Sequence, residues 1–244
     1  MKTRLSVNVN KIALIRNARG SNYPDLVQVS KDIEAFGAEG ITVHPRPDER
    51  HITYADIPQL KAITTTEFNI EGNPRPQKFM DMVLKNCPDQ CTLVPDAENA
   101  LTSDSGWDTI THASFLTETI GALKAKGIRV SIFCDPVAEL IEGAKKVGAD
   151  RIEFYTGPYA ANYHKDRAAA IAPYVKGAKI AQEIGLGINA GHDLNLDNLR
   201  YFQEQVPALL EVSIGHALVV DSLYYGLQNT VQMYLERLSI KDLV

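Results

Sequence analysis

The sequence has little of what marks secreted, membrane-bound or nucleic-acid-binding proteins. Its 244 residues include three cysteines, an odd number too small for a disulfide framework, which favours a reducing cytoplasm. The first residues lack the apolar core of a signal peptide, and no apolar run approaches the length of a membrane span. The net charge is −5 with Lys and Arg scattered, so electrostatics give no case for nucleic acid or an anionic membrane as a partner.

Several chemical motifs are also missing. Cys87 and Cys91 are near enough in sequence to share a metal, but no second Cys/His pair completes a zinc site. We therefore interpret Cys87, Cys91 and Cys134 as small apolar residues. No G-x-S-x-G elbow is present, and no G-x-G-x-x-G or P-loop motif follows an apolar run, which disfavours dinucleotide-binding folds.

What the sequence does contain is a repeating unit. In four stretches a helix-like segment ends in Gly, a short apolar run follows, and the run stops at polar residues. These stretches are 36–44, 126–135, 147–157 and 184–192. Four more apolar runs complete a set of eight: Leu5–Val9, Glu67–Ile70, Cys91–Val94 and Leu209–Ile214. Short β-branched runs bounded by turn residues are typical of buried parallel strands.

Helical patterns lie between these runs, over residues 26–36, 79–84, 115–123 and 137–144, and one long closing helix is predicted over 218–238. Eight alternating strand and helix units in about 240 residues predict a (β/α)₈ TIM barrel with extra short helices. We expect residues 1–244 to form a single domain. An open doubly wound sheet is the alternative fold, disfavoured by the missing nucleotide motifs.

The carboxyl ends of barrel strands meet at one face, where the active site of such a fold lies. The polar residues at or just beyond the eight predicted strand ends are, in chain order, Asn8, Asn10, His44, Arg46, Glu71, Thr102, Asp135, Glu153, Asn189, His192 and His216. Because imidazole and carboxyl groups gather among them, we expect a functional pocket there.

Side-chain chemistry suggests roles for these groups. His44 and His192 can each give or take a proton near neutral pH. Glu71 follows an apolar strand, so burial would raise its pKa and suit it as a general base, whereas pairing with an Arg would lower that pKa and make it structural. Arg19, Arg46 and His51 can clamp phosphate, and Gly191-His192 and Gly215-His216 stand where many barrels hold phosphate on backbone N–H groups.

Other functions stay open at this point. His44, Glu71, His192 and His216 can also form a Zn or Mn site, which would suit a metal-dependent sugar-phosphate epimerase or isomerase. A non-catalytic ligand-binding barrel is a third hypothesis. A Schiff-base enzyme is disfavoured, because Lys11 lies beyond the first strand and the other strands end without Lys. Residues 157–167 form a stretch long enough to be a lid.

Several segments together resemble one family, the pyridoxine 5′-phosphate synthases of vitamin B6 biosynthesis, over nearly the whole chain. The segments that carry the resemblance are Val7–Ala13, Arg16–Gly20, Gly40–Ile52, Asn69–Glu71, Asn189–His192 and Ile214–Ala217. This family condenses 3-amino-2-oxopropyl phosphate with 1-deoxy-D-xylulose 5-phosphate and releases phosphate and water. The resemblance implies no metal or organic cofactor, a cytoplasmic location and a homo-octamer.

The resemblance also implies roles. His44 and Glu71 would accept protons, and His192 would donate one. The implied substrate-binding residues are Asn8, Asn10, Lys11, Arg19, Arg46, His51, Thr102, Glu153, Asp193, Gly215 and His216. Three positions depart from the family pattern: Asn10 and Lys11 replace an Asp-His pair, and Asp193 replaces a common Gly. These departures affect substrate binding more than the reaction.

Overall fold

The computed structural model describes residues 2–96 and 103–239. Its eight strands are β1 (Arg4–Asn8), β2 (Gly40–Val43), β3 (Glu67–Gly72), β4 (Gln90–Leu93), β5 (Arg129–Cys134), β6 (Arg151–Tyr155), β7 (Gly187–Gly191) and β8 (Leu209–Ile214). Each strand pairs in parallel with the next, and β8 pairs with β1 to close the barrel. The predicted (β/α)₈ fold is therefore confirmed, since an open sheet would leave two edge strands unpaired.

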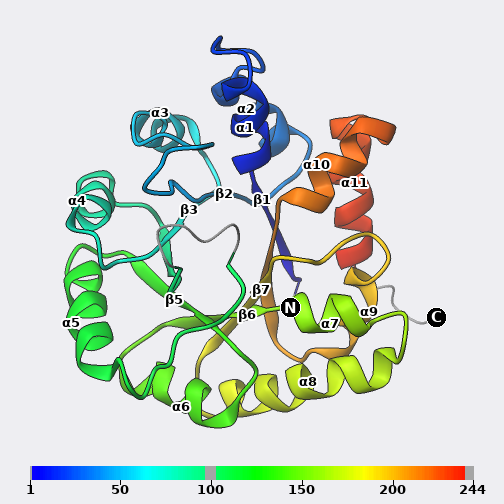
Figure 1. Ribbon diagram of the computed structural model, residues 1–244. Helices are drawn as coiled ribbons and strands as arrows, with labels where there is room; N and C mark the ends of the chain where they lie inside the picture. Colours follow the sequence, from blue (N-terminus) through cyan, green and yellow to red (C-terminus); the bar gives the residue numbers. More distant parts are fainter. Residues whose placement is uncertain (1, 97–102, 240–244) are drawn as a thin grey trace.

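Helices surround the strands, as Figure 1 shows in a view along the barrel. They are α1 (Asn10–Asn17), α2 (Leu26–Ala35), α3 (Asp56–Ile63), α4 (Gln77–Asn86), α5 (Ala113–Lys124), α6 (Ala138–Lys146), α7 (Gly157–Asn162), α8 (Arg167–Glu183), α9 (Leu199–Gln205), α10 (His216–Tyr225) and α11 (Leu227–Leu238). Helices α2, α4, α5 and α6 match the predicted patterns. The extra short helices include α1 and α7.

Local signals explain where these elements begin and end. Asp25 caps α2, because its carboxylate accepts hydrogen bonds from the backbone N–H groups of Val27 and Gln28. Gly37 and Gly148 follow α2 and α6 with φ of 107° and 93°, a left-handed conformation that stops a helix and favours glycine. The Gly that ends each repeat in the sequence thus marks the turn from helix to strand.

The predicted single closing helix is wrong. The segment forms α10 and α11, which are separated at Gly226, where φ is 76° and ψ is 148°. A residue with these angles cannot continue a right-handed helix. Leu223, which the apolar pattern assigned to the buried stripe, is 74% exposed, while Leu218 and Val231 on the two helices are buried.

The interior of the barrel is unusually polar. Apolar residues such as Ile41 and Val43 alternate along the strands with buried polar residues. The polar side chains bond across neighbouring strands: the Ser6 and Thr42 hydroxyls lie 2.7 Å apart, and the Thr92 hydroxyl donates to Asn69 Oδ1 at 3.1 Å. The strands therefore present hydrogen-bonding groups toward the axis, and this polar lining continues into the pocket described below.

Buried charges occupy the base of the barrel, near the amino ends of the strands. Glu67 pairs with Arg129, and Glu211 Oε2 lies 3.7 Å from Arg151 Nη1. Burial, together with the negative charge of Glu67, raises the pKa of Glu211 to about 8. This network lies at the opposite end of the barrel from the active-site face.

Candidate active site

A cavity of about 410 Å³ opens at the carboxyl ends of the strands. The predicted site residues that line it are Asn8, Asn10, Lys11, His44, Arg46, His51, Glu71, Glu153, His192, Asp193, Gly215 and His216. They come from strands and loops spread along the chain, and barrel closure brings them to one pocket. This is the face of the fold where the sequence predicted the pocket.

Three of the predicted residues do not line this pocket: Arg19, Asp135 and Asn189. Arg19 lies just beyond α1 with an exposed side chain and is not part of the cavity wall. Thr102 lies outside the described residues.

Four lining residues were missed: Val94, Ser103, Phe133 and Ser213. Ser213 could have been found, because it lies two residues after Glu211 on β8 and so shares its face of the strand. Val94 follows β4 directly, and Phe133 is the penultimate residue of β5. Both therefore lie at carboxyl ends of strands, where the sequence predicted the pocket. Ser103 lies in a loop with no pattern that would single it out.

Glu71, on β3, is held by polar neighbours from three other strands or loops. Its Oε2 accepts a hydrogen bond from Asn8 Nδ2 at 3.4 Å and lies 3.8 Å from His44 Nδ1. Its Oε1 accepts from the Ser213 hydroxyl at 3.5 Å. Gly215 makes room for Asn8, since a Cβ at position 215 would lie 3.0 Å from the Asn8 Cβ. These contacts orient the carboxylate beside the imidazole of His44.

Burial sets the proton affinities of this pair. It raises the pKa of Glu71 to about 7; the negative charge of Asp96 adds to that rise, while His192 and Arg46 oppose it. Burial and the nearby Arg46 guanidinium hold the pKa of His44 well below its ordinary value, so its imidazole is neutral at pH 7. Glu71 is therefore suited to gain and lose a proton near neutral pH, while His44 is unprotonated and available as an acceptor but is the weaker base.

His192 follows β7 in a strained conformation with φ of 98°, which a residue with a Cβ rarely adopts. Its ring makes an edge contact with Tyr155, with ring centroids 5.5 Å apart, and lies 6.1 Å from the Phe133 ring. Its Nδ1 is 3.2 Å from Asp193 Oδ2. The aromatic walls and the carboxylate hold the imidazole at the pocket, and the hydrogen bond with His192 lowers the pKa of Asp193.

His51 is the centre of a positively charged part of the pocket. Its Nδ1 accepts the backbone N–H of Ile52 at 2.9 Å, so in the neutral ring the proton is on Nε2. Burial, followed by the charges of Arg46, Arg50 and Lys11, lowers the pKa of His51 to about 4. A neutral N–H donor surrounded by cations is suited to bind a phosphate oxygen.

A buried ion pair fixes the loop that carries His51. Arg16 donates to both carboxylate oxygens of Asp56, at 2.7 and 2.9 Å, and both side chains are buried. Arg16 and Asn17 also donate to the backbone oxygen of His51, at 3.3 and 2.8 Å. Burial would raise the pKa of Asp56, but the bonds from Arg16 and Thr53 outweigh burial and lower it. The Arg16–Asn17 segment thus supports the pocket from behind.

Glu153, on β6, lies deeper in the barrel, where burial and the charges of Glu71 and Glu211 raise its pKa well above the ordinary value. Burial therefore favours the protonated form of this carboxyl group, which can donate a hydrogen bond. Gly191 leaves the space that Glu153 occupies, because a Cβ at position 191 would lie 2.4 Å from Glu153 Oε1. The Thr92 hydroxyl donates to the other carboxyl oxygen at 3.5 Å.

Other predictions meet different outcomes. The segment proposed as a lid begins with α7, and Tyr159 on this helix is buried and donates to the backbone oxygen of Asn198 at 2.7 Å, so this part is anchored to the body of the protein. Cys91 and Cys134 are buried as predicted, but Cys87 is exposed at the end of α4, where its φ is 44°. Cys87 is the C-cap of α4 and follows the helix whose buried face consists of Phe79, Met80, Met82 and Val83.

Within residues 2–96 and 103–239, no three His, Cys, Asp or Glu side chains are grouped closely enough to hold a metal ion. None of the helices described there has the length and apolar character that crossing a membrane requires.

The chain is similar to known proteins over nearly its whole length. The family described as "Pyridoxal phosphate biosynthesis protein PdxJ" matches residues 5–240. The chain is 63% identical to pyridoxine 5′-phosphate synthase of Cytophaga hutchinsonii, over 97% of this chain and 99% of that one. It is 61% identical to the protein of the same name from Christiangramia forsetii, over the same shares of the two chains.

Solved structures with low sequence identity share the fold alone. Phosphoribosylanthranilate isomerase from Thermotoga maritima gives a TM-score of 0.60 at 13% identity, covering 96% of this chain and 97% of that chain. Thiamine phosphate pyrophosphorylase from Pyrococcus furiosus gives a TM-score of 0.61 at 14% identity, covering 96% of this chain and 95% of that chain.

The family match and these relatives do not favour the epimerase or isomerase considered from the sequence. A match of this extent, together with relatives of this identity over almost their whole length, shows that the chain belongs to the PdxJ family of pyridoxal phosphate biosynthesis proteins.

Proposed function

We propose that this chain is a pyridoxine 5′-phosphate synthase, which condenses 3-amino-2-oxopropyl phosphate with 1-deoxy-D-xylulose 5-phosphate to form pyridoxine 5′-phosphate, phosphate and water. The names of its relatives support this activity. The observation that carries it is the single pocket that holds Glu71, with a pKa of about 7, beside a neutral His44 and near His192.

The proposed steps assign a proton transfer to each group. The amine of one substrate attacks the ketone of the other, and His192 protonates the hydroxyl group that leaves as water when the imine forms. Glu71 and His44 then remove protons from carbon atoms next to the imine and carbonyl groups, which allows phosphate to leave and the ring to close. Glu153, in the protonated form that its burial favours, donates a hydrogen bond to oxyanions that form during these steps.

Two phosphorylated substrates require two anion-binding regions. We assign Arg46, His51 and Lys11 to the phosphate of 1-deoxy-D-xylulose 5-phosphate, because this part of the pocket carries the cations. We assign Asn8 and the start of α10 to the other substrate: Gly215 and His216 lie there, where backbone N–H groups point outward from a helix N-terminus. Asn10 Oδ1 accepts a hydrogen bond from the His44 backbone N–H at 2.9 Å and so orients the backbone at the end of β2.

The assembly and location follow from the family resemblance. We propose that residues 1–244 form one domain, because the first and last strands of the barrel pair with each other. We further propose a cytoplasmic homo-octamer that binds small phosphorylated substrates. Sedimentation equilibrium of the purified chain tests the octamer, and a monomer at micromolar concentration would contradict it.

The test of the activity is incubation of the purified chain with both substrates. The expected result is a pyridine absorbance that rises together with released phosphate, and neither signal when one substrate is omitted. Addition of a chelator is expected to leave the rate unchanged, which separates this reaction from metal-dependent isomerisation. Absence of the pyridine product with both substrates present would refute the proposal.

A further inference from the structure

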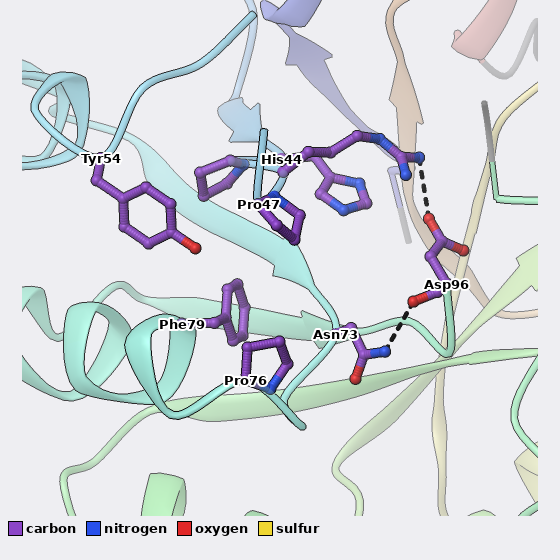
Figure 2. A pocket seen from close by; sticks show the side chains of 9 residues that line it. His44, Pro47, Tyr54, Asn73, Pro76, Phe79 and Asp96 are labelled. Carbon is purple, nitrogen blue, oxygen red and sulfur yellow. Dashed lines mark hydrogen bonds and ion pairs between the residues drawn. The ribbon is translucent and has the colours of Figure 1, made fainter. Parts of the chain in front are cut away.

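Asp96 is a buried carboxylate that joins several loops at the wall of the pocket. Its side chain is 6% exposed, and its Oδ2 accepts hydrogen bonds from Arg46 Nη2 at 2.9 Å and from the Ser103 hydroxyl at 2.6 Å. Its backbone oxygen accepts from Asn73 Nδ2 at 2.7 Å. Figure 2 shows the bonds from Asp96 to Asn73 and to the guanidinium of Arg46.

These contacts connect three of the loops that follow barrel strands. Arg46 comes from the loop after β2, Asn73 follows β3, and Asp96 and Ser103 lie between β4 and α5. Ser103 and Arg46 line the large cavity, whereas Asp96 lies behind them, against an apolar crevice. The walls of this crevice include Pro47, Tyr54, Pro76 and Phe79 (Figure 2). Asp96 is therefore placed to hold side chains that face substrate without lining the large cavity itself.

A buried guanidinium needs a counter-charge and a fixed partner. The Arg46 side chain is 7% exposed, so without Asp96 its charge would lose a partner in a region with little water. A charged hydrogen bond to one nitrogen of the planar guanidinium also restricts the direction of its remaining N–H groups. The bond from Ser103 restricts Asp96 in turn.

We propose that Asp96 is a positioning residue, which fixes the guanidinium of Arg46 for phosphate binding and offsets its positive charge beside Glu71. The catalytic part of this proposal rests on the proposed function. The contact between Asp96 and Arg46 is independent of that function.

The electrostatics around Glu71 support the second half of the proposal. Asp96 raises the pKa of Glu71, whereas Arg46 lowers it. The charged and titratable groups that face Glu71 are His44, Arg46, Cys91, Asp96, Glu153 and His192. Asp96 and Arg46 contact each other and have opposite effects on Glu71. Removal of Asp96 should therefore lower the pKa of Glu71, and removal of Arg46 should raise it.

The test is a double-mutant cycle with Asp96→Asn, Arg46→Met and the double variant. Inorganic phosphate is the probe, and its Kd is measured by titration calorimetry, because this measurement needs no turnover. We expect D96N to weaken phosphate binding about tenfold, as the loss of one charged hydrogen bond implies. In the R46M background the same change should have no further effect, because Asp96 acts through Arg46.

Asp104→Asn is the matched control. Asp104 is an exposed neighbour of Ser103 whose side chain accepts a bond from Ser105, so D104N removes one negative charge without touching Arg46. We expect its Kd for phosphate to equal that of the wild type. Ser103→Ala removes one of the two bonds to the Asp96 side chain and keeps the charge. If D96N does not fold, S103A takes its place in the cycle and should weaken phosphate binding only when Arg46 is present.

Turnover provides the second readout. The acid limb of kcat against pH should move to lower pH in D96N and to higher pH in R46M, which a merely structural role for Asp96 would not produce. Any of three results would overturn the proposal. The first is unchanged or tighter phosphate binding in D96N, and the second is an equal loss of phosphate affinity when D96N is added to R46M. The third is no phosphate binding by the wild type. Absence of pyridine product from the wild type would refute the proposed function and leave the phosphate cycle valid.

Discussion

Glu71→Gln should stabilise the protein at alkaline pH while it abolishes turnover. The pKa of this carboxyl group is raised from 4.5 to about 7, mainly by burial. A tenfold change in proton affinity corresponds to about 1.4 kcal/mol, so ionised Glu71 destabilises the folded protein by roughly 3 kcal/mol. The folded pKa is the higher one, so this group's contribution to stability is fully present below pH 4.5 and is lost as the pH rises through 7. A neutral Gln avoids that loss.

The assay is urea unfolding of wild type and E71Q at pH 5 and pH 8. We expect E71Q to be more stable by up to roughly 3 kcal/mol at pH 8, and most of this difference to disappear at pH 5. Glu183→Gln, at an exposed position on α8, is the control and should change stability by less than about 0.5 kcal/mol at either pH. Equal stability of E71Q and wild type at pH 8, or a difference that does not depend on pH, would refute the reasoning.

Three further changes test other parts of the site. Gly191→Ala places a Cβ 2.4 Å from Glu153 Oε1, so we expect a loss of about 1–3 kcal/mol in urea unfolding and a fall in kcat; wild-type stability would contradict the close contact. Arg16→Met leaves Asp56 without its buried partner and should destabilise the fold by about 3–5 kcal/mol, measured in the same way; a loss below about 1 kcal/mol would show that the pair is not structural. Lys11→Met should raise KM for 1-deoxy-D-xylulose 5-phosphate about tenfold and reduce its dependence on salt, and an unchanged KM would remove Lys11 from the phosphate site.

The eight strands could be predicted from the sequence because each follows a glycine turn or forms a short apolar run with clear ends. The closing helices could not, since the apolar spacing across Leu218, Leu223 and Val231 looks continuous. Their separation depends on the backbone angles of Gly226, which the apolar pattern does not encode. Helix α7 was missed for a similar reason, because six residues are too few to show a helical period.

The site was predictable where function follows from strand position. His44, Glu71 and His192 were found because strand ends converge in a barrel. Asp96 was missed, because its importance lies in contacts with Arg46 and Ser103 that only the folded loops create. Arg19 stays a predicted substrate-binding residue; it has an exposed side chain just beyond α1 and does not line the pocket.

The most direct test of the catalytic assignment compares pyridine formation by the single variants His44→Asn, Glu71→Gln and His192→Asn with formation by the triple variant. If the three side chains work as one proton-transfer unit in a common pocket, the triple variant will turn over about as fast as the slowest single variant, with circular dichroism unchanged. Losses that multiply from one substitution to the next, or single variants that keep wild-type kcat, would contradict the assignment.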